Sequence, residues 1–105
     1  MKRVVAFVPD LMDRSRISVS ASSASVSLEF VGRPEALAEA AAGADLVLVD
    51  LARPGVLDVL ASIGATTVGF ASHVDRALFV AAGAAGCDEI LARSVFFARL
   101  PRLLG

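Results

Sequence analysis

Three short apolar runs limit the folds open to this chain more than any other feature of its sequence. They are Val4–Val8, Leu46–Val49 and Thr67–Ala71, and none of them alternates apolar with charged or amide side chains. A strand with one face in water alternates in this way, whereas a strand covered on both faces is apolar or β-branched throughout. The runs therefore predict buried parallel strands with helices packed on both faces of a sheet.

Helix start and stop signals lie between and after these runs. Proline is favoured in the first turn of a helix and glycine just beyond its end. The segments that fit run from Pro34 to Gly43, from Pro54 to Gly64, and over Arg76–Ala85 with Asp75 as cap and Gly86 as stop. We expect a last strand over Glu89–Ala92 and a final helix from Val95, capped by Ser94. Pro101 should kink or shorten that helix.

The segment between Leu11 and Phe30 fits two structures, because seven serines lie between Ser15 and Ser27. Apolar side chains alternate with serines over residues 17 to 22, as in a strand. The same residues can form a serine-rich helix that precedes a strand over Val26–Phe30. We predict the helix followed by the strand, because the rest of the chain alternates between helices and strands in this order.

The resulting order is a strand followed by a helix, repeated five times. Right-handed crossovers between parallel strands then place helices on both faces of the sheet. We predict an α/β fold, a three-layer, doubly wound sandwich around a parallel five-stranded sheet, in a single domain over residues 1–105.

Composition excludes several classes of function. The chain has 10 Lys and Arg against 11 Asp and Glu, a net charge of -1, and neither Trp nor Tyr. It therefore lacks the broad basic field and the stacking platforms that nucleic-acid binding requires. The longest uncharged stretch, Val59 to Val74, is shorter than the roughly 20 apolar residues that span a bilayer. A lone Cys87 excludes an internal disulfide, so we expect a cytoplasmic protein with no nucleic-acid or membrane partner.

Residues with chemical potential follow the ends of the predicted strands. Asp10, Asp50 and Arg93 each stand at such an end, and the segment Ala71–His73 follows the fourth strand. The carboxyl ends of parallel strands meet at one edge of the sheet, where ligands bind in this architecture. Two carboxylates brought together there repel each other unless a cation lies between them. Asp10 and Asp50 therefore imply Mg²⁺ or a counter-charge from Arg93.

The segment Asp45–Gly55, with the sequence DLVLVDLARPG, resembles the phosphoacceptor segment of response-regulator receiver domains. Asp10 resembles the acidic metal-binding position of that family, and Ala85–Arg93 resembles the approach to its fifth strand. The resemblance covers nearly the whole chain and implies a flavodoxin-like receiver fold. It also implies that Asp50 accepts a phosphoryl group from a histidine kinase, that Asp10 and Asp50 hold Mg²⁺, and that Arg93 binds phosphate.

The chain also departs from the receiver pattern. Pro9 stands where receivers carry a second acid, which leaves Asp10 alone. Ala71 replaces the usual Ser or Thr, with Ser72 one residue further on. Arg93 replaces a lysine, and a planar guanidinium holds a phosphoryl oxygen differently from a compact ammonium. In these departures the chain resembles pseudo-receivers, which keep the fold but lose or modify the phosphorylation switch.

We therefore expect a stand-alone receiver-like signalling protein with no attached output domain, which acts through protein–protein contact and has a modified acidic site. One alternative is a functional receiver, phosphorylated on Asp50 with Mg²⁺. Another is a small-ligand-binding, flavodoxin-like module. We expect no enzyme activity beyond, at most, transfer of a phosphoryl group from a donor onto Asp50.

Each site residue also has a structural interpretation. Asp10 could simply cap the first helix, and Asp13 could stabilise its positive end. Asp50 could cap its loop. Arg93 could form a permanent ion pair with Asp50 in place of binding phosphate. His73 is expected to be an exposed loop residue.

Two further features concern burial and partners. Cys87 is expected to be a small buried side chain, because no positive neighbour marks it as reactive. The final helix contains Phe96, Phe97 and Leu100, more apolar residues than one stripe against a sheet needs. We predict that part of this surface binds a protein partner or a second copy in a homodimer. The alternative is that these side chains complete the core.

Overall fold

The computed structural model describes residues 1–105 and contains one sheet of five parallel strands in the order β2-β1-β3-β4-β5. The strands are β1 (Arg3–Phe7), β2 (Ser27–Phe30), β3 (Leu46–Asp50), β4 (Thr67–Ala71) and β5 (Glu89–Ala92). The predicted parallel five-stranded sheet is confirmed. Every residue of β3 and β4 is buried, which is why these runs carry no exposed polar face.

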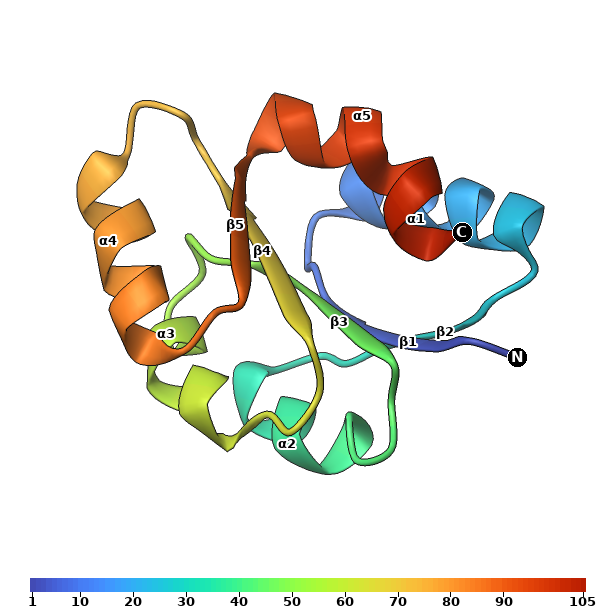
Figure 1. Ribbon diagram of the computed structural model, residues 1–105, viewed down its shortest axis with the longest axis horizontal. Coiled ribbons are helices and arrows are strands. Elements are labelled where there is room, and N and C mark those ends of the chain that lie inside the picture. The colour runs from blue at the N-terminus through green and yellow to red at the C-terminus, as the bar shows by residue number, and fades with distance from the viewer.

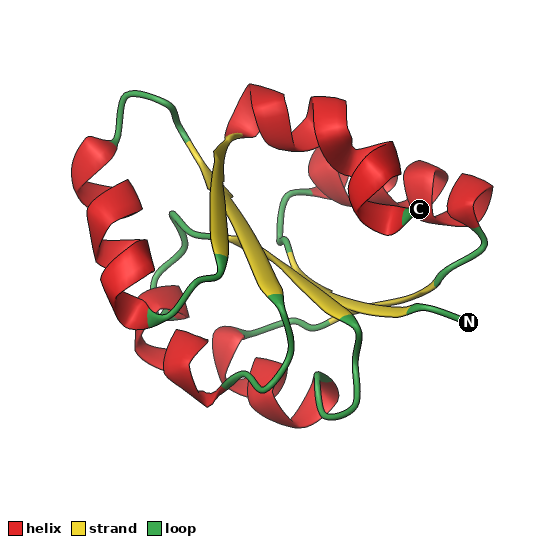
Figure 2. Ribbon diagram, in the orientation of Figure 1, coloured by secondary structure: helices red, strands yellow, loops and turns green.

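Helices cover both faces of the sheet and confirm the three-layer arrangement (Figures 1 and 2). The elements are α1 (Leu11–Ala24), η1 (Pro34–Ala36) leading into α2 (Leu37–Ala40), α3 (Val56–Val59) leading into η2 (Leu60–Ser62), α4 (Arg76–Ala85) and α5 (Arg93–Leu104), where η marks a 3-10 helix. Helices α1 and α5 lie side by side on one face, and α2, α3 and α4 cover the other.

Two apolar cores fill the spaces between these layers. Along β1, Val4 and Ala6 join the core beneath α1 and α5, whereas Val5 and Phe7 join the core on the opposite face. Successive side chains on a strand point to opposite faces, so both sets must be apolar when both faces are covered. The unbroken apolar runs of the sequence are explained by this arrangement.

The serine-rich segment forms a helix, as predicted, and a strand follows it. Only Asp13, Ile17 and Ala21 of α1 are buried, and these residues recur every four positions along one face. Most of the serines face solvent or line the shallow surface beside α5. Ser25 closes the helix in the left-handed conformation, with a φ of 56°.

Helix α5 differs from the prediction at both ends. It begins at Arg93 with Ala92 at the cap position, so Ser94 lies inside the helix and the predicted serine cap is wrong. Pro101 does not end the helix, which continues to Leu104. The three residues after a proline still donate to carbonyl groups in the preceding turn, so the last turn persists near the chain end.

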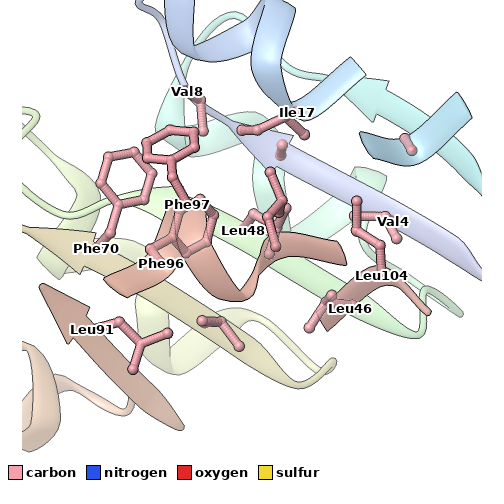
Figure 3. Packing of buried hydrophobic residues seen from close by; sticks show 14 residues of the cluster. Val4, Val8, Ile17, Leu46, Leu48, Phe70, Leu91, Phe96, Phe97 and Leu104 are labelled. Atoms are coloured by element: carbon pink, nitrogen blue, oxygen red, sulfur yellow. The ribbon is translucent and has the colours of Figure 1, made fainter. Parts of the chain in front are cut away.

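The side chains of α5 also contradict the predicted docking patch. Phe96, Phe97 and Leu100 are 0%, 7% and 1% exposed, so they complete the core and form no exposed apolar patch; Phe97 and Leu100 reach only the floor of a surface hollow. Figure 3 shows the two phenylalanines packed with Phe70 of β4, and the Phe70–Phe96 ring centroids lie 4.6 Å apart. A helix seated between a sheet and a neighbouring helix buries a wider arc than one on a sheet alone. None of the helices is both long and apolar enough to cross a membrane.

Candidate functional site

Asp10 follows β1 and caps the first turn of α1. Its carboxylate accepts a hydrogen bond of 2.9 Å from the backbone N–H of Asp13. The extended backbone at Asp10 and the acceptor side chain are the features that an N-cap residue needs. The structural interpretation of Asp10 is therefore confirmed, and one of its two carboxylate oxygens is engaged within the chain.

Asp50 is the last residue of β3 and is 7% exposed. Its Oδ1 accepts a hydrogen bond of 3.1 Å from the backbone N–H of Ala52. Its Oδ2 accepts one of 3.1 Å from Nε of Arg53, whose side chain is 41% exposed. Both oxygens of Asp50 are therefore held by residues of the loop that follows it.

Arg53 was missed in the sequence analysis as the partner of Asp50. The available signal was its position three residues after the carboxylate, at the start of a loop closed by Pro54 and Gly55. Such a turn brings the side chain of Arg53 back toward the strand end.

Arg93 stands at the start of α5 and does not form the ion pair with Asp50 that is one alternative to a phosphate-binding role. Its guanidinium instead donates two hydrogen bonds to Asp13, one from each terminal nitrogen to each carboxylate oxygen. Asp13 is 2% exposed, so this contact satisfies a buried carboxylate. Asp13 is thus more than a surface charge at the helix end. The burial of Asp13 could have been predicted from its spacing, because it lies on the same helical stripe as Ile17 and Ala21.

The charges around Arg93 stabilise its protonated form. The hydrogen bonds to Asp13 raise the pKa of Arg93, and the negative charges of Asp13, Asp50 and Asp10 act in the same direction. The guanidinium also lies over two aromatic rings, 5.1 Å from the centroid of Phe97 and 5.6 Å from that of Phe70. Arg93 therefore lies between the acidic edge and the aromatic core.

A shallow hollow of about 440 Å³ opens at this edge of the sheet. Its lining residues are Asp50, Ala52, Arg53, Pro54, Phe70, Ala71, Ser72 and Arg93. The structure thus brings Asp50 and Arg93 to one hollow, together with Ser72, although their side chains are not paired. At the end of β4, Ala71 is buried in the core beneath α2, α3 and α4, and the Ser72 hydroxyl belongs to the exposed residue that follows.

The donor set at this edge fits a resident Mg²⁺ poorly. Magnesium prefers carboxylate and other oxygen ligands in an octahedral arrangement. The chain contains no group of three or more His, Cys, Asp or Glu side chains placed to hold a metal. Asp10 accepts from a backbone N–H, Asp50 accepts from Arg53, and Pro9 supplies no carboxylate. Guanidinium groups compensate the acidic charge here.

The two remaining candidates lie away from this hollow. His73 is exposed in the loop between β4 and α4, as predicted. Cys87 is buried, as predicted, and burial raises the pKa of its thiol. The Cys87 thiol lies 3.3 Å from the carbonyl oxygen of Glu89, to which it donates.

Comparisons with known proteins agree with this description of the fold. No protein-family model matches the chain, and no curated protein matches it. A response regulator from Hahella chejuensis is similar to it, with a TM-score of 0.83, 20% identity, and coverage of 99% of this chain and 92% of that one.

Two further solved structures extend the comparison. The receiver domain of Ssk1 from Saccharomyces cerevisiae, crystallised with the histidine phosphotransfer protein Ypd1, gives a TM-score of 0.80 and 11% identity, with coverage of 98% of this chain and 86% of that chain. A protein from Burkholderia pseudomallei, provisionally assigned to pilus assembly, gives a TM-score of 0.76 and 16% identity, with coverage of 99% of this chain and 87% of that chain. The chain therefore has the fold of response-regulator receiver domains, as its resemblance at Asp45–Gly55 implied.

Proposed function

We propose that this chain is a receiver-like, cytoplasmic signalling domain that acts through protein–protein contact and whose acidic site is compensated by arginine side chains. The observation that carries the proposal is the state of Asp50. It is 7% exposed, and its two oxygens accept hydrogen bonds from Ala52 and Arg53. In a phosphoacceptor site, one of these oxygens must be free to attack and the other must face the cation that offsets the developing charge.

The neighbouring residues support the same function. Arg93, at the position where receivers carry a lysine, is held by Asp13 and is not directed to Asp50. Ala71 stands at the position where receivers carry Ser or Thr, and its methyl group can donate no hydrogen bond. The contact between Arg93 and the buried carboxylate of Asp13 consists of two hydrogen bonds, and breaking it costs free energy. This cost favours one fixed conformation of the edge. The residues of the hollow give no support to the small-ligand-binding alternative.

Intact mass spectrometry tests the proposal directly. The purified chain is incubated with acetyl phosphate and Mg²⁺, and we expect no gain of phosphoryl mass. The variant Asp50→Asn serves as the matched control, because it keeps the size of the side chain and replaces the nucleophilic carboxylate with an amide that accepts no phosphoryl group. A stoichiometric gain in the wild-type chain that is lost in Asp50→Asn would overturn the proposal and support the phosphoacceptor alternative.

A second variant tests whether Asp50 resists phosphorylation because Arg53 occupies its oxygen or because the site lacks the second acid. Arg53→Ala removes the guanidinium from Asp50 while leaving Ala52 in place. We expect this variant also to gain no phosphoryl mass, because the chain still lacks the second acid at Pro9. Phosphorylation of Arg53→Ala alone would show that the site is competent but closed by Arg53.

A further inference from the structure

A groove formed by two adjoining hollows lies between α1 and α5, away from the acidic edge. One hollow of about 360 Å³ includes Arg16, Val19, Phe97 and Leu100 among its lining residues. A second hollow of about 310 Å³ continues toward the chain end, and the two share Val19, Ser20 and Pro101. Figure 1 shows the two helices side by side along this face.

The walls of the groove are mostly small side chains, together with the apolar Val19 and the charged Arg16. Val19 is 66% exposed, and the serines and alanine around it keep the walls low. Leu11 and Met12, at the start of α1, are 78% and 74% exposed. These two residues do not line the hollows, but exposed apolar side chains of this size on a groove-forming helix are typical of an interaction surface.

The helices that form the groove carry an excess of positive charge. Together α1 and α5 contain five arginines, Arg14, Arg16, Arg93, Arg99 and Arg102, and one acid, Asp13. Asp13 is buried and paired with Arg93, so it does not offset the others. The only ion pairs of the structure involve Arg3, Arg53 and Arg93, which leaves Arg16, Arg99 and Arg102 exposed without a carboxylate partner.

The opposite helical layer has the reverse balance. There η1, α2, α3 and η2 contain Glu35, Glu39 and Asp58 and no basic residue, and α4 adds only Arg76. The layer of α1 and α5 is therefore the more basic of the two, and its Arg16 lines the groove. An acidic partner would meet complementary charge on this face and like charge on the other.

Building on the proposed function, we propose that the α1–α5 groove binds an acidic, amphipathic helix of a partner protein. Apolar side chains one or two turns apart would enter the two hollows, and flanking carboxylates would meet Arg16, which lines the first hollow, and Arg102, one turn beyond the lining residue Ala98. A concave groove with small walls accepts the ridge of a helix, whereas a lipid surface is flat. Nucleic acid would be repelled by the acidic layer and finds no Trp or Tyr to stack on.

Selection from a displayed library of helical peptides of about 15 residues, four helical turns, tests this inference on the full chain. The groove variant combines Val19→Glu with Arg102→Glu, both at exposed positions. The matched control combines Val80→Glu with Arg76→Glu on α4, where Val80 is 74% exposed. Circular dichroism melting confirms that each variant is folded.

We expect the recovered peptides to be acidic, with apolar residues at helical spacing. Their affinity should fall about tenfold or more on the groove variant and stay within about twofold on the control, since the introduced carboxylates and the acidic peptide carry like charges, which repel each other. Replacing their Glu residues by Lys should also abolish binding. The inference is overturned if the peptides bind the wild-type chain and the groove variant equally, or if no peptide is recovered.

The alternative occupants are tested with the same proteins. Co-sedimentation with anionic phosphatidylglycerol vesicles, lost in the groove variant, would assign the groove to lipid and overturn the inference. Self-association in sedimentation velocity, lost in that variant, would assign it to a second copy with the same consequence. Peptides that bind another face would leave the proposed function intact, whereas phosphorylation of Asp50 would overturn that function whatever the groove binds.

Discussion

Arg93 and Asp13 lie 80 positions apart in the sequence and form a two-point contact between the start of α5 and the start of α1. The carboxylate is 2% exposed, and the side chain of Arg93 is 47% exposed. Without Arg93, the carboxylate of Asp13 would be buried and unpaired, whereas without Asp13 the guanidinium of Arg93 would still contact water.

Replacing Arg93 should destabilise the fold more than replacing Asp13. Arg93→Met leaves a buried carboxylate without its partner, which costs about 3–5 kcal/mol of the free energy of unfolding. Asp13→Asn leaves a guanidinium that water can still solvate, and should cost about 1–3 kcal/mol. Urea denaturation of both variants measures the difference. Equal losses, or a larger loss for Asp13→Asn, would show that the pair is not governed by the burial of the acid.

Gly69 should tolerate no side chain. A Cβ atom at this position would lie 2.6 Å from Cγ and 2.7 Å from both Cδ atoms of Leu51, which is buried beside β4. Gly69→Ala should therefore cost about 1–3 kcal/mol through overpacking. The double variant Gly69→Ala/Leu51→Ala should cost less than the sum of the two single changes, because shortening Leu51 opens the space. Additive losses in thermal unfolding would contradict this contact.

Phe96 should act in the core and not at an interface. It is 0% exposed and contacts the rings of Phe70 and Phe97. Phe96→Ala should cost about 3–5 kcal/mol, whereas the exposed Val19→Ala should change stability by no more than about 0.5 kcal/mol. Sedimentation velocity of the folded fraction should give the same molecular mass for both. A stable Phe96→Ala protein with an altered mass would restore the docking surface that the burial of Phe96 contradicts.

Cys87 should make stability fall at alkaline pH. Burial raises the pKa of its thiol above the ordinary value of 9.0, so the folded chain retains a proton that the unfolded chain releases. The stabilisation is present below the unfolded pKa and is lost as the pH rises toward the folded value. Between about pH 8 and pH 10, the free energy of unfolding should fall more steeply for the wild-type chain than for Cys87→Ala. Parallel slopes would contradict the prediction.

The sheet could be predicted from the sequence because burial on both faces leaves a local signal. Val4–Val8 and Thr67–Ala71 are apolar or β-branched throughout, and the punctuation between such runs gives the order of the elements. The convergence of Asp50 and Arg93 on one edge follows from the same order, since parallel strands end together. These conclusions need no knowledge of individual contacts.

The pairing of charges could not be predicted in the same way. Arg93 stands near both Asp13 and Asp50, and side-chain reach and burial decide between them. Arg93 pairs with Asp13 because Asp13 lies on the buried stripe of α1 and needs a partner, whereas Asp50 already accepts a hydrogen bond of 3.1 Å from Arg53. The burial of Phe97 likewise depends on the α1–α5 packing, which leaves no mark in the local sequence of α5.

The uneven distribution of charge between the two helical layers affects the rate at which a charged partner associates as well as the face to which it binds. A molecule with arginines on one side and carboxylates on the other has a dipole, and its field turns an approaching charged molecule before the surfaces touch. This orienting field reaches about 30 Å at 0.01 M salt and about 10 Å at 0.1 M. Association at the arginine side would therefore slow down steeply as ionic strength rises, while dissociation would change little.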